Sequence, residues 1–174
     1  MPTLAQILRT TTPVSPLLRK ARRLGLHGVQ TLIALAVSRG CRHYAAPVAL
    51  PPNVPPRELL SDDELTILLL VGENAYNPTA IRCAAQLARS EHVDPGTLAR
   101  FARMEKTERV LAHIAHAGLE HDDGGKAFWQ DLLTRLHAPL RRSEPDLPHW
   151  SRFVTLPGRQ SSGVVPGHWL VPSA

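Results

Sequence analysis

Three histidines close to a group of acids are the nearest approach to a metal site in the sequence. His113 and His116 are three residues apart, so on a helix they share one face, and His121 follows beside Glu120 and Asp122. Imidazole nitrogens and carboxylate oxygens both bind zinc, but this spacing matches no named zinc motif. Histidines near a helix C-terminus are also favoured by the helix dipole. We therefore expect no cofactor, with zinc at His113, His116 and His121 as the alternative.

Two cysteines, Cys41 and Cys83, form no metal or redox motif, which is typical of a reduced intracellular protein. Cys83 lies in an alanine-rich segment, where a small buried thiol is expected. Cys41 stands among Arg39, Arg42 and His43, and nearby cations favour a thiolate. The chain contains no G-x-S-x-G, glycine-rich phosphate loop or H-E-x-x-H motif. Enzymatic activity is left uncertain, and a protein that is not an enzyme is favoured; a metal-dependent or cysteine enzyme ranks third.

Positive charge is concentrated at the N-terminal end of a chain whose formal net charge is +5. Residues 1–57 contain basic residues and no acid at all, which favours a polyanionic partner such as nucleic acid or an anionic membrane. Four of the cations fall on one predicted helix and are our candidate anion contacts: Arg19, Lys20, Arg22 and Arg23. Arginine greatly outnumbers lysine throughout, so a bias of genome composition explains the same excess.

A second candidate surface is the segment 86–104, QLARSEHVDPGTLARFARM, which resembles the rhythm of a helix-turn-helix motif. If the motif forms, Thr97, Arg100 and Arg103 face the major groove of DNA, and the basic N-terminal helix contacts phosphates. The sequence departs from the motif at Glu91 and His92, where an apolar residue and a glycine are usual. Any two helices packed through a short loop produce the same apolar spacing.

The elements that must position these residues are helices with clear start signals. Ser15-Pro16, Asn77-Pro78 and Asp94-Pro95 each place a capping residue before a proline, and Ser61-Asp-Asp-Glu forms a capping box. Apolar residues at helical spacing predict a helix over 28–38, a largely buried helix ended by Gly72, and a helix ended by Gly118. The polar run 105–109 has two options: one continuous helix that is exposed to solvent there, or a break after which Thr107 caps a second helix. The last helix runs to about His137.

We predict a mainly α fold, a single compact multi-helix domain of about five to seven short helices. The chain divides into a basic N-terminal helical arm (1–46), a Pro-rich linker (47–60), a helical core (61–140) and a Pro-rich C-terminal tail docked on the core (141–174). Docking is expected because Trp150, Phe153 and Trp169 each bury a large area. Segments 152–156 and 168–171 are expected either as two short strands, which would form one short β-hairpin, or as extended pieces laid across the body.

No apolar run approaches the ~20 residues of a transmembrane helix, and the first residues lack the features of a secretory signal. We therefore expect a cytoplasmic protein. Our first hypothesis is a non-catalytic helical binding or scaffold protein, whose basic N-terminal segment takes an anionic or protein partner, or which forms a homo-oligomer. The alternative is a helix-turn-helix DNA-binding transcriptional regulator.

Overall fold

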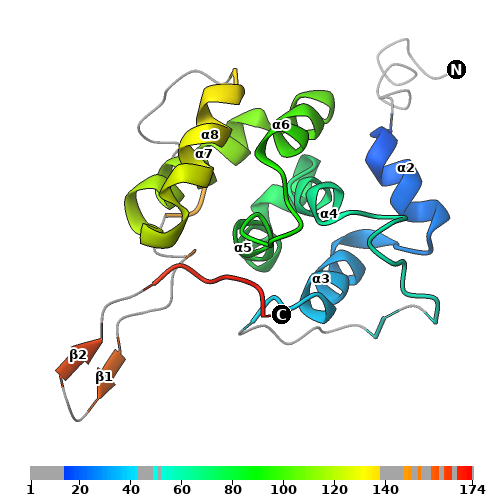
Figure 1. The fold of residues 1–174 in the computed structure, drawn as a ribbon. Coiled ribbons are helices and arrows are strands. Elements are labelled where there is room, and N and C mark those ends of the chain that lie inside the picture. Colours follow the sequence, from blue (N-terminus) through cyan, green and yellow to red (C-terminus); the bar gives the residue numbers. More distant parts are fainter. Residues whose placement is uncertain are drawn as a thin grey trace, which may run out of the picture.

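The computed structural model describes residues 14–42, 49–50, 52–137, 147–149, 153, 158–160, 163–165 and 168–173. Within these ranges seven α-helices pack into one compact domain (Figure 1), which confirms the predicted mainly α fold. The α-helices are α2 (Pro16–Arg23), α3 (Gly28–Ser38), α4 (Asp62–Leu68), α5 (Pro78–Leu87), α6 (Pro95–Met104), α7 (Glu108–His121) and α8 (Lys126–Arg135). Two 3-10 turns, η1 (Gly72–Tyr76) and η2 (Asp123–Gly125), precede α5 and α8.

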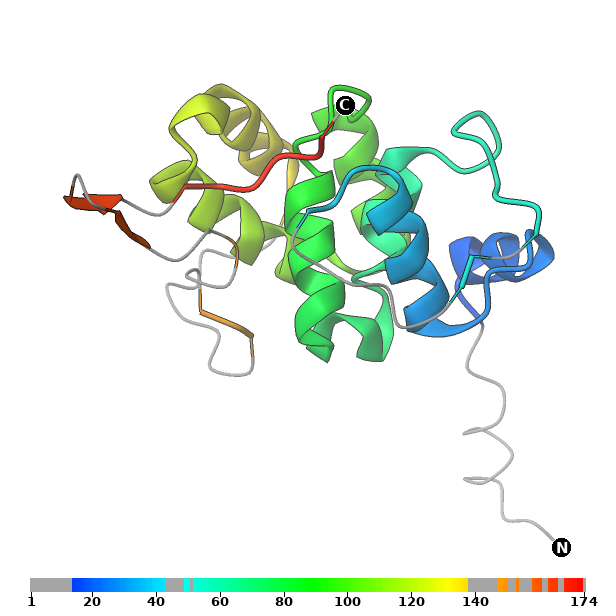
Figure 2. The same cartoon turned by 90° about the horizontal axis from the view of Figure 1, so that it is seen from below.

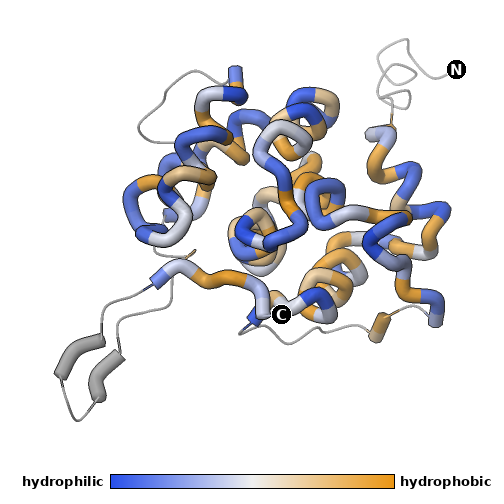
Figure 3. The backbone as a smooth tube through the Cα atoms, in the orientation of Figure 1, coloured by the Kyte–Doolittle hydropathy of each residue, from blue (hydrophilic) through white to orange (hydrophobic). Residues whose placement is uncertain are grey.

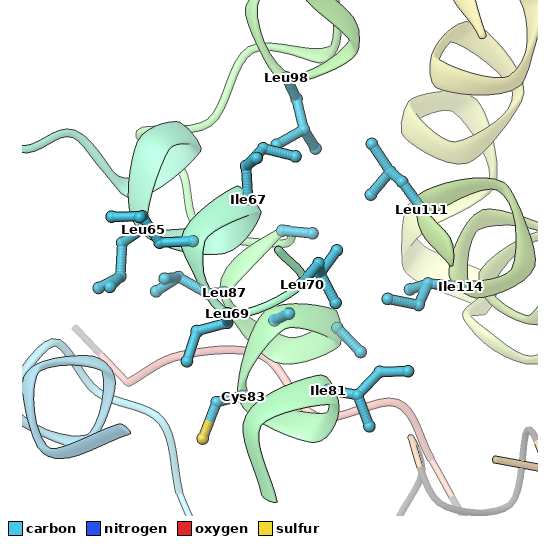
Figure 4. Packing of buried hydrophobic residues seen from close by; sticks show 14 of the residues in the cluster. Leu65, Ile67, Leu69, Leu70, Ile81, Cys83, Leu87, Leu98, Leu111 and Ile114 are labelled. Carbon is cyan, nitrogen blue, oxygen red and sulfur yellow. The ribbon is translucent and has the colours of Figure 1, made fainter. Parts of the chain in front are cut away.

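The centre of the domain is α4, all seven residues of which are buried. Its start is fixed by the predicted capping box: the Ser61 hydroxyl accepts from the Glu64 N–H at 3.2 Å, and Glu64 accepts from the Ser61 N–H at 3.0 Å. Aliphatic side chains of α4 and α5 meet those of α6 and α7 around it (Figure 4), including Ile67, Leu98 and Leu111. A core built from leucine, isoleucine and alanine is what the low aromatic content requires.

Helices α2 and α3 belong to the same core. Leu17 and Ala21 of α2 and Leu32 and Ile33 of α3 are buried in one hydrophobic cluster with α4 and α5. Figure 3 shows α3 as apolar along most of its length, as expected for a helix covered on several sides. The segment expected as an N-terminal arm therefore contributes directly to the core.

Two helix ends differ from the sequence expectation, since α4 ends at Leu68 before Gly72 and α7 continues past Gly118, whereas the run 105–109 follows the predicted option of a break at Thr107. The predicted end at Gly118 is wrong, because α7 continues to His121 and Gly118 packs directly under the indole of Trp129. The polar run 105–109 breaks the chain into two helices: Lys106 adopts a positive φ of 58° and the Thr107 N–H returns to the Ala102 carbonyl at 2.8 Å. Gly118 was predicted to end the helix because the contact with Trp129, which explains the glycine, cannot be seen from its neighbours in sequence.

The C-terminal residues 168–173 run as an extended strap along α5 toward the end of α3 (Figure 2). The Trp169 indole is buried and donates to the Ala85 carbonyl at 3.3 Å, while the Gln86 amide donates to the Val171 carbonyl at 3.1 Å. The Ser173 N–H donates to the Gly40 carbonyl at 2.9 Å. Trp150 lies outside the described residues.

Within the described ranges one antiparallel hairpin is present, at a place that the sequence did not indicate. Its strands are β1 (Gly158–Gln160) and β2 (Gly163–Val165), with Gly158 opposite Val165. Residues 168–171 belong to the strap, which confirms the alternative of an extended piece laid across the body, with Trp169 and Leu170 buried against the helices. Of the other predicted strand, 152–156, only Phe153 is described.

Candidate functional site

Helix α2 turns a basic face to solvent. Arg19, Arg22 and Arg23 are exposed, whereas Leu17 and Ala21 on the other side are buried. Within the described residues none of these three guanidinium groups has a carboxylate partner. We call these three residues the arginine face. Its charges are available to a ligand without first breaking an ion pair.

The fourth predicted contact, Lys20, is engaged within the protein. Its ammonium lies 2.6 and 2.8 Å from the two carboxylate oxygens of Glu64, the capping-box residue of α4. The lysine side chain is 42% exposed, so the pair contributes about 0–1 kcal/mol to stability. Its main effect is on charge, because Lys20 is locally neutralised and Glu64 does not oppose an anion at the arginine face.

Both ends of α2 are fixed, which makes the arginine face a rigid surface. At the start, Ser15 caps the helix and Glu105, at the end of α6, accepts from the Leu17 N–H at 3.0 Å. A carboxylate there also interacts favourably with the positive end of the helix dipole. At the other end, Gly25 has a φ of 79° and the Leu26 N–H returns to the Ala21 carbonyl at 3.0 Å, a Schellman motif.

Beside the arginine face lies an open pocket of about 450 Å³. One wall is the turn after α2, with Arg23 and Leu24, and the other is the segment before α4, residues 52–56 and Leu59. Figure 1 shows this segment passing close to α2 and its following turn. Apart from Arg23 and Asn53 the lining side chains are aliphatic or proline, so the pocket is apolar with one charge at its edge.

A buried ionic network holds the second wall in place. The Arg39 guanidinium donates to the Asp62 carboxylate at 2.9 Å and to the Pro55 carbonyl, in the pocket wall, at 3.1 Å. Asp62 also accepts from Arg57 at 3.2 Å and from the Ser90 hydroxyl at 2.8 Å. Burial lowers the pKa of Arg39, and the Asp62 carboxylate opposes that shift. The network therefore ties the pocket wall to α3, α4 and the α5–α6 connection.

The residues predicted to contact DNA lie on α6, but α5 and α6 are not joined by the short turn of a helix-turn-helix motif. Residues 88–94 join α5 to α6, which is longer than the turn of three or four residues typical of the motif. The Thr97 N–H caps onto Asp94 at 2.7 Å, and the Arg100 guanidinium lies 5.3 Å from the ring centre of Phe101. Arg103 donates to the Arg135 carbonyl at 3.1 Å. The geometry gives this alternative no additional support.

The three histidine side chains lie in different surroundings. His113 contacts the Pro148 carbonyl at 2.8 Å and packs edge-on against Phe153, while His121 lies 3.6 Å from the Glu120 carboxylate. His116 is half-buried on the same helix. Among the residues that the structure describes, no three histidine, cysteine or acidic side chains are arranged to hold a metal ion.

The expected thiolate at Cys41 is wrong. Cys41 and Cys83 are both buried, and the Cys41 thiol lies 3.6 Å from the Cys83 carbonyl oxygen. A hydrogen bond with Cys83 and burial raise the pKa of the Cys41 thiol far above its ordinary value. The neighbouring cation Arg39 is directed to Asp62 instead.

The pocket is the feature that sequence reasoning missed. Val54 and Leu59 lie inside the stretch predicted to be an extended Pro-rich linker, although large apolar side chains in such a stretch are a signal of contact. None of the helices in the described ranges is both long enough and apolar enough to cross a membrane. Comparison of the chain with protein-family models, curated proteins and solved structures gave no match.

Proposed function

We propose that this protein is a non-catalytic helical binding protein that docks an anionic partner on the arginine face. The observation that carries the proposal is the set of three exposed guanidinium groups on one rigid helix, none with a carboxylate partner in the described part of the chain. Neighbouring cations are treated differently by the fold, since Lys20, Arg39 and Arg57 are each paired with an acid.

The spacing of the arginine face suits an extended or helical acidic segment. Arg19 and Arg23 are four residues apart and Arg19 and Arg22 three apart, so their side chains are neighbours, with Cβ atoms about 5–6 Å apart. Guanidinium groups bind carboxylates and phosphates through paired N–H donors. Because both ends of α2 are fixed, little ordering of the helix opposes binding.

The test is a comparison of two variants with the same change of net charge. One replaces Arg19, Arg22 and Arg23 with glutamine. The matched control replaces three exposed arginines elsewhere, Arg42, Arg100 and Arg103, two of which belong to the DNA-binding alternative. Binding of a labelled glutamate-rich peptide is measured by fluorescence anisotropy at low ionic strength, with circular dichroism to confirm folding.

We expect the first variant to bind about tenfold more weakly, from roughly 0.5 kcal/mol for each of three exposed ion pairs. The control variant loses much less, and added salt weakens binding of the wild type. An equal loss in both variants contradicts the proposal, because it shows that net charge alone determines binding. Binding of duplex DNA that depends on Arg100 and Arg103 favours the regulator instead.

A further inference from the structure

The pocket beside the arginine face leaves apolar side chains exposed to solvent, where a ligand could cover them. Val54 is 44% exposed and Leu59 is 53% exposed, and both line the pocket. They are two of the six large hydrophobic side chains exposed in the described ranges; the other four are dispersed, one just before α2, one in η1, one in α6 and one in the strap. Clustered exposed apolar side chains in a hollow are typical of binding sites.

The walls of this pocket are held before any ligand arrives. Pro55 is buried and its carbonyl is bonded to Arg39, while the Leu59 and Leu60 N–H groups both donate to the Pro56 carbonyl at 3.1 Å. Leu60, next to Leu59, is fully buried. A pocket with fixed walls loses little conformational freedom when it is filled.

We propose that the pocket receives an apolar side chain from an acidic protein segment whose carboxylates pair with the arginine face. This inference rests on the proposed function and names its partner as a protein. Arg23 belongs to both features, since its side chain lines the pocket and lies on the arginine face. The apolar residue therefore stands next to, or within one helical turn of, a carboxylate in the partner.

Two other classes of anionic partner fit these surroundings less well. Single-stranded nucleic acid is usually bound by stacking bases on aromatic side chains, and none of the residues lining the pocket is aromatic. A membrane surface is usually bound by a helix that inserts its apolar side, but Leu17 and Ala21 of α2 are already buried in the core. An aliphatic pocket with a cation at its edge matches an acidic peptide with an aliphatic anchor.

The experiment compares two glutamate-rich peptides that differ at one central position, leucine in one and serine in the other. Each is titrated by fluorescence anisotropy against the wild type and against Val54→Ser with Leu59→Ser. The matched control is Tyr76→Ser with Met104→Ser, two exposed side chains outside the pocket. Both double variants change exposed side chains, and circular dichroism with thermal unfolding confirms that they fold.

We expect the leucine peptide to bind the wild type about tenfold more tightly than the serine peptide, from partial burial of one leucine side chain. The advantage disappears in Val54→Ser with Leu59→Ser and persists in the control. Equal binding of both peptides that still depends on the arginine face overturns the pocket inference and leaves the proposed function standing. Absence of binding by either peptide overturns both. Tighter binding of duplex DNA or of vesicles with anionic lipid that depends on the arginine face overturns the pocket inference alone.

Discussion

Replacing Asp62 with asparagine tests whether the buried ionic network holds the molecule together. The Asp62 side chain is fully buried, and that of Arg39 is only 6% exposed. The carboxylate accepts hydrogen bonds from two guanidinium groups and the Ser90 hydroxyl. Asparagine keeps the shape and one acceptor oxygen, but it removes the charge and directs an amide donor toward other donors.

The expected loss is large because the substitution leaves the Arg39 guanidinium buried without a counter-charge. Removing one partner of a buried pair destabilises proteins by about 3–5 kcal/mol. A domain of this size has a total free energy of unfolding of about 5–15 kcal/mol, so the change is a substantial fraction of it. With a urea slope of roughly 2–3 kcal/mol per molar, the unfolding midpoint falls by about 1–2 M.

The matched control is Arg57→Gln, which removes a different partner of the same carboxylate. The Arg57 side chain is 45% exposed, so its contribution is about 0–1 kcal/mol. Urea unfolding followed by circular dichroism measures both variants, with the slope checked for two-state behaviour. An Asp62→Asn loss no larger than that of Arg57→Gln would refute the reasoning, since it would show that Arg39 is not held by charge.

Three further substitutions follow from particular backbone and burial features. Gly118→Ala places a Cβ against the Trp129 indole, so urea unfolding should show a loss of about 1–3 kcal/mol where an unhindered helix would gain about 1 kcal/mol. Lys106→Gly removes the cost of a positive φ of 58° at a residue with a side chain. It should raise the free energy of unfolding by roughly 0.5–1 kcal/mol, measured as a higher melting temperature. Burial raises the pKa of Asp63, which accepts from the Asp94 N–H at 3.1 Å, to about 6 from an ordinary value of 3.8. A raised folded pKa means that stability is lost as pH increases through this window, so Asp63→Asn should gain up to about 3 kcal/mol relative to the wild type between pH 4 and pH 7. A pH-independent difference would contradict that assignment.

The helix starts were readable from the sequence because capping is local. Ser61 bonds to a residue three positions on, and Asn77 and Asp94 accept from N–H groups two or three positions on. All the atoms involved lie within one turn, so residue types at fixed spacing are sufficient. The apolar run 67–71, which begins inside α4, likewise predicted the burial of this part of the chain.

Features that join distant segments were not readable. Gly118 carries a mid-helix role only because Trp129 folds back over it, and Cys41 is buried beside α5 although it lies next to cations in sequence. The pocket depends on the path that brings residues 52–59 alongside the turn after α2. Nothing in the sequence of either segment indicates that it lies beside the other. The pocket between them therefore could not be predicted from the sequence.

The basic N-terminal segment shows why a count of charges does not locate a binding site. Its described cations include three that are paired with acids at positions 62 and 64, so each of these positive charges has a neighbouring negative charge. Only the pairing pattern distinguishes them from the arginine face, and that pattern requires the start of α4 to lie near Lys20 of α2 and Arg39 after α3. The binding proposed above therefore depends on three arginines beside an apolar pocket, and a ligand that reads only total charge does not discriminate this surface from any other basic one.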